Sequence, residues 1–173
     1  MKFSKLMFII LTCIVLASCN MMPDNSQSIE DYIEIAKSDV ESVIQAIETK
    51  DEILLKDMFS EYALKTMDDY SASFRQMTDF IDGEIVSSEI SLAEESTSTL
   101  GAKRKIVIKY ICKLATSSQK QYDVLVSDIV VNEQEKDNCG VYTVRVTSSD
   151  YQTSSAEPGI HLPQLSDGIT EVK

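Results

Sequence analysis

The stretch 105-KIVIKYICKL-114 decides the fold of the second half of this chain. Its apolar residues alternate with lysines, so that one face would carry Ile106, Ile108, Tyr110, Cys112 and Leu114, and the other Lys105, Lys109 and Lys113. A period of two, with one apolar and one charged face, is typical of a half-buried strand in an antiparallel sheet. The stretch therefore predicts a sheet that packs one face on a core.

The alternation continues on both sides of this stretch, from Gly83 to about Val146. A preceding strand holds Val86, Ile90 and Leu92, and residues 94–103 are predicted to form a long hairpin connection. After a turn at 117–119, residues 122–131 are apolar on both faces, which predicts a central or covered strand. A charged turn at 133–140 leads to a last strand over 141–147, with Tyr142, Val144 and Val146 on one side.

Before Gly83 the apolar period is 3.6, which predicts helices. Ser28 with Asp31 can cap the first helix, whose apolar stripe is Ile29, Tyr32, Ile33, Ala36, Val40, Val43, Ile44 and Ile47. Asp51 can cap a short second helix. Ser60 can cap a long third helix, which Asp82-Gly83 would end, with apolar positions Ala63, Met67, Tyr70, Phe74, Met77 and Ile81. The fold class is therefore α+β, with N-terminal helices on a four-stranded antiparallel sheet.

The first nineteen residues concern export. Lys2 and Lys5 precede an apolar run over residues 6–17, which is the pattern of a secretory signal. A permanent membrane helix is the alternative, but it needs roughly 20 apolar residues. The run ends in Leu16-Ala17-Ser18-Cys19, which resembles the lipobox of bacterial lipoproteins. The resemblance implies that residues 1–18 are a signal peptide and that Cys19 carries a diacylglyceryl group, which anchors the protein to the extracytoplasmic face of a cell membrane.

The composition after residue 18 indicates how the mature chain is organised and how it is charged. Residues 19–27 are polar and are predicted to be a tether, residues 28–147 one domain, and residues 148–173 a polar tail. All 28 acidic residues and 14 of the 16 basic residues lie after residue 18, which gives the mature chain a formal charge of −14. Such a surface repels nucleic acid, and it repels anionic lipid headgroups, so the acyl chains are expected to hold the protein at the membrane.

Two cysteines, Cys112 and Cys139, remain after the lipobox. A disulfide between them is one alternative, because the compartment permits it. In a meander, however, one strand would separate them by roughly 9 to 10 Å, which favours separate thiols. No CxxC, Gly-rich phosphate loop, GxSxG motif or metal-ligand cluster occurs, so we expect neither a cofactor nor a metal. The single histidine, His161, is expected at the surface of the tail.

A family resemblance joins these elements. Three helices before a four-stranded meander, with 47-IETKD-51 leading into 58-MFS-60, resemble the nuclear transport factor 2-like superfamily over about residues 28–147. More narrowly, 58-MFSEYA-63 and 80-FIDGEI-85 are similar to an uncharacterised family of bacterial lipoproteins with that fold. The resemblance implies a curved sheet wrapped around a long helix, a cone whose mouth can hold a small ligand, and frequent dimerisation through the sheet.

Candidate ligand-binding residues follow from the strand alternation, which directs Tyr110, Tyr122, Asp128 and Tyr142 towards the helices, where Tyr70 and Phe74 would face them. An acid among valines and tyrosines would have its pKa raised by burial, as a general acid or base requires near neutral pH. Alternatively, a bulge at Ser127-Asp128 turns the acid to solvent and the tyrosines fill the core. Arg145 is expected to pair with an acid on the outer face.

Two functions follow from this pattern. The first is a non-catalytic lipoprotein that binds a small apolar ligand in the cone or a protein partner on the sheet, with homodimerisation through the outer sheet face as a separate expectation. The second is an isomerase-like or dehydratase-like acid-base enzyme for a small apolar substrate, with Asp128 as the base.

Overall fold

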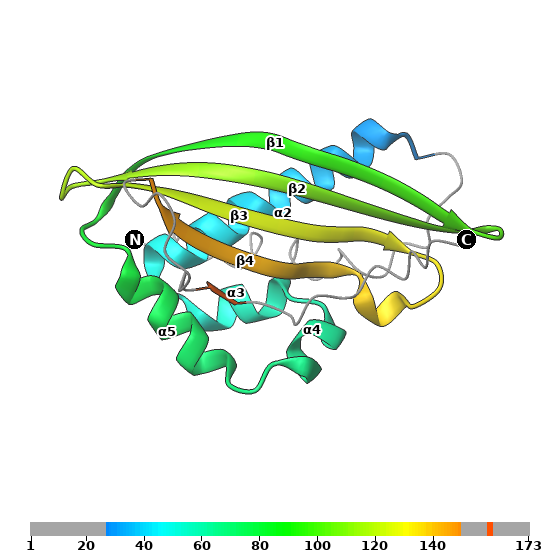
Figure 1. The fold of residues 1–173 in the computed structure, drawn as a ribbon, viewed down its shortest axis with the longest axis horizontal. Coiled ribbons are helices and arrows are strands. Elements are labelled where there is room, and N and C mark those ends of the chain that lie inside the picture. Colours follow the sequence, from blue (N-terminus) through cyan, green and yellow to red (C-terminus); the bar gives the residue numbers. More distant parts are fainter. Residues whose placement is uncertain (1–26, 150–158, 161–173) are drawn as a thin grey trace, which may run out of the picture.

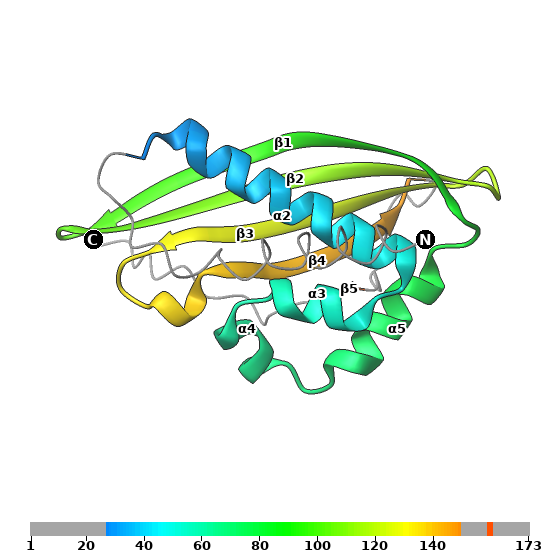
Figure 2. The same cartoon turned by 180° about the vertical axis from the view of Figure 1, so that it is seen from behind.

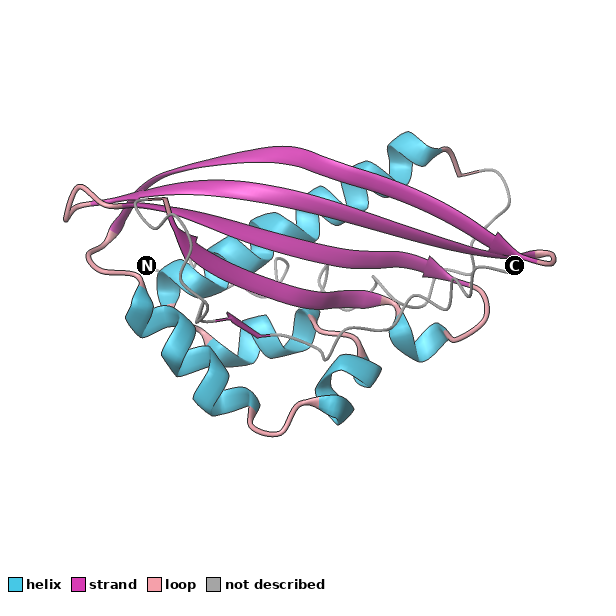
Figure 3. Ribbon diagram, viewed as in Figure 1, coloured by secondary structure: helices cyan, strands magenta, loops and turns pink. Residues whose placement is uncertain are grey.

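The computed structural model describes residues 27–149 and, in a short strand, residues 159–160. Four helices precede the sheet: α2 (Ile29–Thr49), α3 (Glu52–Met58), α4 (Glu61–Thr66) and α5 (Tyr70–Phe80). The strands are β1 (Ile85–Leu100), β2 (Lys103–Thr116), β3 (Gln121–Asn132), β4 (Gly140–Ser148) and β5 (Gly159–Ile160), with a short 3₁₀ helix, η2 (Lys136–Asn138), before β4. Figures 1 and 3 show this α+β arrangement, in which four long strands form a curved, open sheet.

The strands follow one another in the sheet in chain order, and each pairs antiparallel with the next. The predicted four-stranded meander is therefore confirmed. The two-residue strand β5 adds to it, because residues 159 and 160 pair with Arg145 and Val144 at the edge of β4. None of the helices in the described ranges is long and apolar enough to cross a membrane.

Helix α2 begins and ends where its capping residues lie. The Ser28 N–H donates to the Asp31 carboxylate at 2.9 Å, and the Asp31 N–H donates back to Ser28 Oγ at 3.3 Å, which completes the predicted capping box. At the other end Lys50 adopts a left-handed conformation with φ 53°, and its N–H donates to the carbonyls of the last turn. The helix therefore spans six turns between two defined caps.

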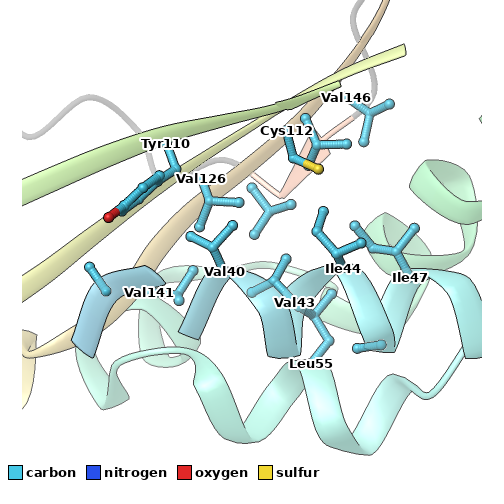
Figure 4. Close-up of a cluster of buried hydrophobic side chains, with 14 of the residues drawn as sticks. Val40, Val43, Ile44, Ile47, Leu55, Tyr110, Cys112, Val126, Val141 and Val146 are labelled. Atoms are coloured by element: carbon cyan, nitrogen blue, oxygen red, sulfur yellow. The ribbon is translucent and has the colours of Figure 1, made fainter. Parts of the chain in front are cut away.

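Helix α2 crosses one face of the sheet (Figure 2). Figure 4 shows Val40, Val43 and Ile44 directed towards the sheet residues Tyr110, Cys112 and Val126. Both sides of this contact are almost completely shielded from water, and the core continues under α3 and α5 through Leu55 and Met77. Burial of this apolar surface is the main stabilising contribution to the fold.

The predicted long third helix over residues 60–81 is wrong. The structure divides it into α4 and α5 with a break at residues 67–69. The reason is a competing cap: the Asp69 carboxylate accepts the Ala72 N–H at 2.9 Å and starts α5 anew. Ser60 does cap α4, as predicted, through the Ala63 N–H at 3.1 Å. Two short helices thus take the place of the predicted single helix, and the chain turns between them beneath the sheet (Figure 1).

The predicted long connection over residues 94–103 is also wrong. Strand β1 continues to Leu100, which pairs with Lys103, so that only Gly101 and Ala102 form the turn. Gly101 has φ +64°, as a two-residue hairpin turn requires. The sequence obscured this hairpin because β1 is exposed along nearly its whole length and so lacks the apolar alternation that marks a buried strand.

A bulge in β4 changes which residue faces the core. Ser127 pairs with Thr143 but Asp128 pairs with Val141, so Tyr142 is the extra residue. Val141 is fully buried, and its carbonyl accepts the Ser60 N–H at 2.9 Å, which joins the helices to the sheet. The predicted alternation of Tyr142 with Val144 and Val146 is therefore interrupted, and Val141 takes the inward position. Cys112 is buried in the core and forms no disulfide with Cys139, as predicted.

The core account predicts different outcomes for two residues of α3. Replacing Leu55, which is 0% exposed, with alanine removes buried contacts and leaves a cavity, so we expect the free energy of unfolding to fall by about 2 to 5 kcal/mol. The matched control is Ile53→Ala, because Ile53 is 73% exposed, and its effect should stay within about 0.5 kcal/mol. Urea denaturation measures both, and equal losses would contradict the packing of α3.

Candidate functional site

Asp128 lies in the interior of the domain. It stands on β3 opposite Ile108 of β2 and Val141 of β4, and it is 1% exposed. Of the two alternatives left by the sequence, the bulge beside Asp128 is present, but its extra residue is on β4, and the acid stays inside. A buried carboxyl group among aliphatic side chains is costly unless it is neutral or hydrogen-bonded.

The partner of Asp128 is a second acid, Asp39, on the middle of α2. The two carboxyl groups are close enough for the charge of Asp39 to act on Asp128, and Asp39 is itself half-buried. Burial raises the pKa of Asp128 well above its ordinary value, and the adjacent charge of Asp39 raises it further. Burial also raises the pKa of Asp39, while the neighbouring Asp128 carboxyl group acts in the opposite direction. Because Asp128 is the more deeply buried of the two, we expect the pair to keep one proton mainly on Asp128 above the ordinary aspartate pKa.

The surroundings of Asp128 support a shared proton. Within the described part of the chain, no O–H or N–H donor meets good hydrogen-bond geometry with either Asp128 carboxyl oxygen. The backbone at Ile129 lowers the pKa of Asp128, but by less than burial and Asp39 raise it. Two ionised carboxylates accept hydrogen bonds and donate none, so the contact between Asp39 and Asp128 becomes a hydrogen bond only when one carries a proton. The arrangement can hold or transfer one proton.

Sequence reasoning identified Asp128 but missed Asp39. A signal was present, because Asp39 stands in the series Tyr32, Ala36, Asp39, Val43 and Ala46, whose spacing of four and three marks the buried face of a helix. An acid at such a position requires a partner on the opposing element. If the buried face of α2 is packed on the inward face of β3, Asp39 and Asp128 are predicted to be neighbours.

The candidate tyrosines of the sheet have backbone partners. The Tyr110 hydroxyl donates to the Ile33 carbonyl of α2 at 2.9 Å, and burial raises the pKa of Tyr110. The Tyr122 hydroxyl accepts the Asp82 N–H at 3.0 Å, and its ring meets Phe80 edge-on. Both rings are almost fully buried. Tyr122 is six residues from Asp128 along β3, or about 20 Å in an extended strand, so the structure does not bring Tyr122 to the acid.

The other candidate aromatics lie on α5 and β4. Tyr70 stacks on Phe74 with ring centroids 6.3 Å apart, and its hydroxyl donates to the Glu52 carbonyl at 3.2 Å. Burial and the nearby acids Glu52, Asp57 and Asp51 raise the pKa of Tyr70. Tyr142 is half-buried at the β4 bulge and packs on the edge of the core. The hydroxyls of Tyr70 and Tyr110 thus tie the rings to helical carbonyls, as filled core positions do.

A surface pocket of about 300 Å³ lies at a different place. It is lined by residues at the end of α2, the end of α5 and the start of β1, namely Ile47, Glu48, Lys50, Thr78, Ile81, Gly83, Glu84 and Ile85. None of the predicted site residues lines it. Within residues 27–149, no three histidine, cysteine or acidic side chains gather as metal ligands would. Cys19 and His161 lie outside the described residues.

Buried Cys112 completes the set of titratable groups in the core. Burial raises the pKa of its thiol to about 11, while a hydrogen bond with the backbone at Glu89 acts in the opposite direction. A thiol with such a pKa is protonated at neutral pH and behaves as a small apolar side chain. Cys112 therefore fills space beside α2 and is not a nucleophile.

Comparison with known proteins gives one family. The model described as Domain of unknown function (DUF5104) matches residues 42–150, which is more than half of the chain. No curated protein matches. The match runs from the second half of α2 to the end of β4, so it includes Asp128 and begins three residues after Asp39.

The acid pair predicts a pH-dependent effect of Asp128→Asn on stability. The pKa of Asp128 is raised in the folded protein, so the wild type is fully stabilised below the ordinary value of 3.8 and loses stability as the pH rises towards the folded-state pKa. Asparagine cannot ionise and can donate to Asp39. We therefore expect little difference at pH 4 and a stabilisation of the variant by about 1 to 3 kcal/mol at pH 8.

Urea denaturation at the two pH values measures this effect. The control is Asp123→Asn, because Asp123 stands on the same strand, half-buried on the opposite face, where it pairs with Lys113 and Thr147. Asp123→Asn removes a carboxyl group opposite Lys113 and should give no stabilisation at pH 8. Destabilisation by Asp128→Asn at pH 8 would show that the charged form of Asp128 is the one that the fold requires.

Proposed function

This chain belongs to the family described as Domain of unknown function (DUF5104), and we propose that it is an exported lipoprotein that binds a protein partner without catalysing a reaction. In this proposal Cys19 carries the lipid and holds the protein on the extracytoplasmic face of a cell membrane. The lipobox-like 16-LASC-19 after a short apolar run supports the anchor. The order of helices and sheet suits a nuclear transport factor 2-like cone.

Strand β1 is the observation that carries the binding proposal. It is sixteen residues long, and all its residues except Ile85 and Ile90 are exposed. In the described chain, β1 pairs only with β2, so its outer edge offers a row of backbone donors and acceptors. Val86 and Leu92 add exposed apolar side chains. An extended segment of a partner protein can add to such an edge as a further strand.

Bulges and acidic side chains on β1 restrict which extended segments can pair with its edge. Register shifts at Val86 and Ala93 mark two bulges, and Glu89 and Glu95 place negative charge along the strand. Bulges and charges are the means by which edge strands avoid indiscriminate association. We therefore expect the partner segment to be extended and basic.

The described interior gives less support to a ligand inside the cone. Tyr70, Tyr110 and Tyr122 have their hydroxyls tied to backbone groups, and the aliphatic side chains beneath α2 are in close contact (Figure 4). Homodimerisation through the outer sheet face stays a prediction.

An acid-base enzyme is the second candidate function, and the Asp39–Asp128 pair is the observation that favours it. Asp128 with a raised pKa, beside a carboxylate that can take its proton, is suited to proton transfer near neutral pH. Its substrate would be small and apolar, because the side chains beside Asp128 on the neighbouring strands, Ile108 and Val141, are aliphatic. An ordinary pKa for both carboxyl groups would remove this candidate.

The anchor predicts a covalent lipid on Cys19. In the native host the wild type should incorporate labelled palmitate and partition into the detergent phase, whereas Cys19→Ala should do neither. The matched control is Cys139→Ala, which should be labelled like the wild type. Equal labelling of Cys19→Ala and the wild type, or no labelling of either, would refute the lipid anchor.

The binding proposal predicts a position-dependent cross-link. A photo-reactive residue at Ser96 on β1 should give one adduct of defined mass in native membranes, and the same residue at Glu41 on the exposed side of α2 should give none. Leu92→Asp should abolish the Ser96 adduct, and Ile53→Asp, at an exposed position of α3, should leave it unchanged. Equal adducts from Ser96 and Glu41 would contradict binding at β1.

A further inference from the structure

The turn between β1 and β2 projects from the domain. Figures 1 and 2 both place it at one end of the long axis, beyond the start of α2 and beyond η2. A Cβ added at Gly101 would meet no atom within 4 Å, and Leu100 is 71% exposed. Ala102 and Lys103 are also exposed. A leucine exposed in this way at the tip of a hairpin has little packing role in the domain.

This tip, residues 100–105, lies at the same end of the domain as the start of α2. Arg104 is stacked over the ring of Tyr32, 5.4 Å from its centroid, and donates to the Tyr32 hydroxyl at 3.1 Å. Tyr32 belongs to the first turn of α2, which begins at Ile29. Residues 20–28 separate Cys19 from Ile29, and a span of ten residues reaches at most about 36 Å. A lipid on Cys19 would therefore keep this end of the domain near the bilayer.

The tip differs in charge from the rest of the chain. Lys103, Arg104 and Lys105 are consecutive, in a sequence that carries 28 acidic residues and only 16 basic ones. Acids at this end of the domain include Glu133, whose carboxylate accepts the backbone N–H of Arg104 at 2.7 Å, and Glu30 at the start of α2. The loop after β3 and the start of α2 are set back from the tip in both views. Lys103 is the charged residue nearest the turn of the hairpin.

We propose that residues 100–105 form a second membrane contact, in which the basic side chains bind anionic lipid headgroups and Leu100 enters the interface. This inference rests on the proposed lipid anchor at Cys19. A hairpin tip that carries basic residues and an exposed leucine suits such a contact, since each Lys or Arg near an anionic surface strengthens binding about fivefold. The rest of the domain is acidic, so an anionic surface repels it. The contact would fix the long axis of the sheet towards the bilayer and leave the edge of β1 open to a partner.

The test uses the mature lipidated chain in vesicles of phosphatidylcholine alone or with phosphatidylglycerol. Intact mass first establishes the lipid on Cys19, so failure of the anchor is recognised separately. An environment-sensitive fluorophore is then placed at Ala102→Cys in a Cys139→Ser background, and at Gln119→Cys in the turn at the opposite end of the sheet as the control. We expect a blue shift and quenching by brominated lipid at position 102 in the anionic vesicles, and neither at position 119.

Charge-reversal variants distinguish an effect of the basic residues at the tip from an effect of the net charge of the protein. Lys103→Glu with Lys105→Glu should reduce the quenching at position 102 at least about fivefold. Lys50→Glu with Lys113→Glu changes the net charge equally at the other end of α2 and β2, and should leave the quenching unchanged. Arg104 is kept because it packs on Tyr32. A label at position 102 that stays in water in anionic vesicles, or equal effects of the two charge reversals, would overturn the proposal.

Discussion

The structure depends on one contact, the packing of α2 across a face of the sheet. Its stripe of small and β-branched side chains meets Cys112 and Val126, and no residue at the centre of this contact is exposed to water. Strands β2 to β4 could not keep their inward faces dry without this helix. The capping box at Ser28 and the left-handed Lys50 set the two ends of the helix and so its position along the sheet.

The same contact brings two acids together. Asp39 belongs to the buried face of α2, and Asp128 belongs to the inward face of β3, so packing the apolar side chains forces the carboxyl groups to meet. A proton between them converts a repulsive pair into a hydrogen bond. Aliphatic residues at these positions would pack without this penalty, so the pair lowers stability at neutral pH.

Much of this fold could be predicted from the sequence because its strongest signals are local. The caps at Ser28, Asp51 and Ser60 and the alternation of β2 each depend on neighbouring residues, and the structure confirms them. The errors arose where a local signal was ambiguous. Asp69 divides a helix whose apolar period continues through the break, and the exposed strand β1 lacks the alternation that burial imposes.

The candidate site was less predictable for a different reason. Asp128 was recognisable from its own strand, but its partner Asp39 lies 89 residues earlier, and only the packing of helix on sheet joins them. The aromatic cluster was predicted from strand alternation, which gives the face of the sheet but not the partner of each ring. Hydrogen bonds to distant backbone groups, such as Ile33 for Tyr110 and Asp82 for Tyr122, decided where those rings point. Such long-range partners leave no local pattern in a sequence.

Carbon-13 NMR of the aspartate carboxyl groups, followed across pH, tests the central claim most directly. The account predicts that the Asp128 carboxyl stays protonated far above pH 3.8, and that its chemical shift and that of Asp39 change together, because the two groups share one proton. Independent titration of both groups near the ordinary aspartate value would contradict the account. It would mean that the two carboxyl groups are apart in solution and that α2 does not pack on β3 as described.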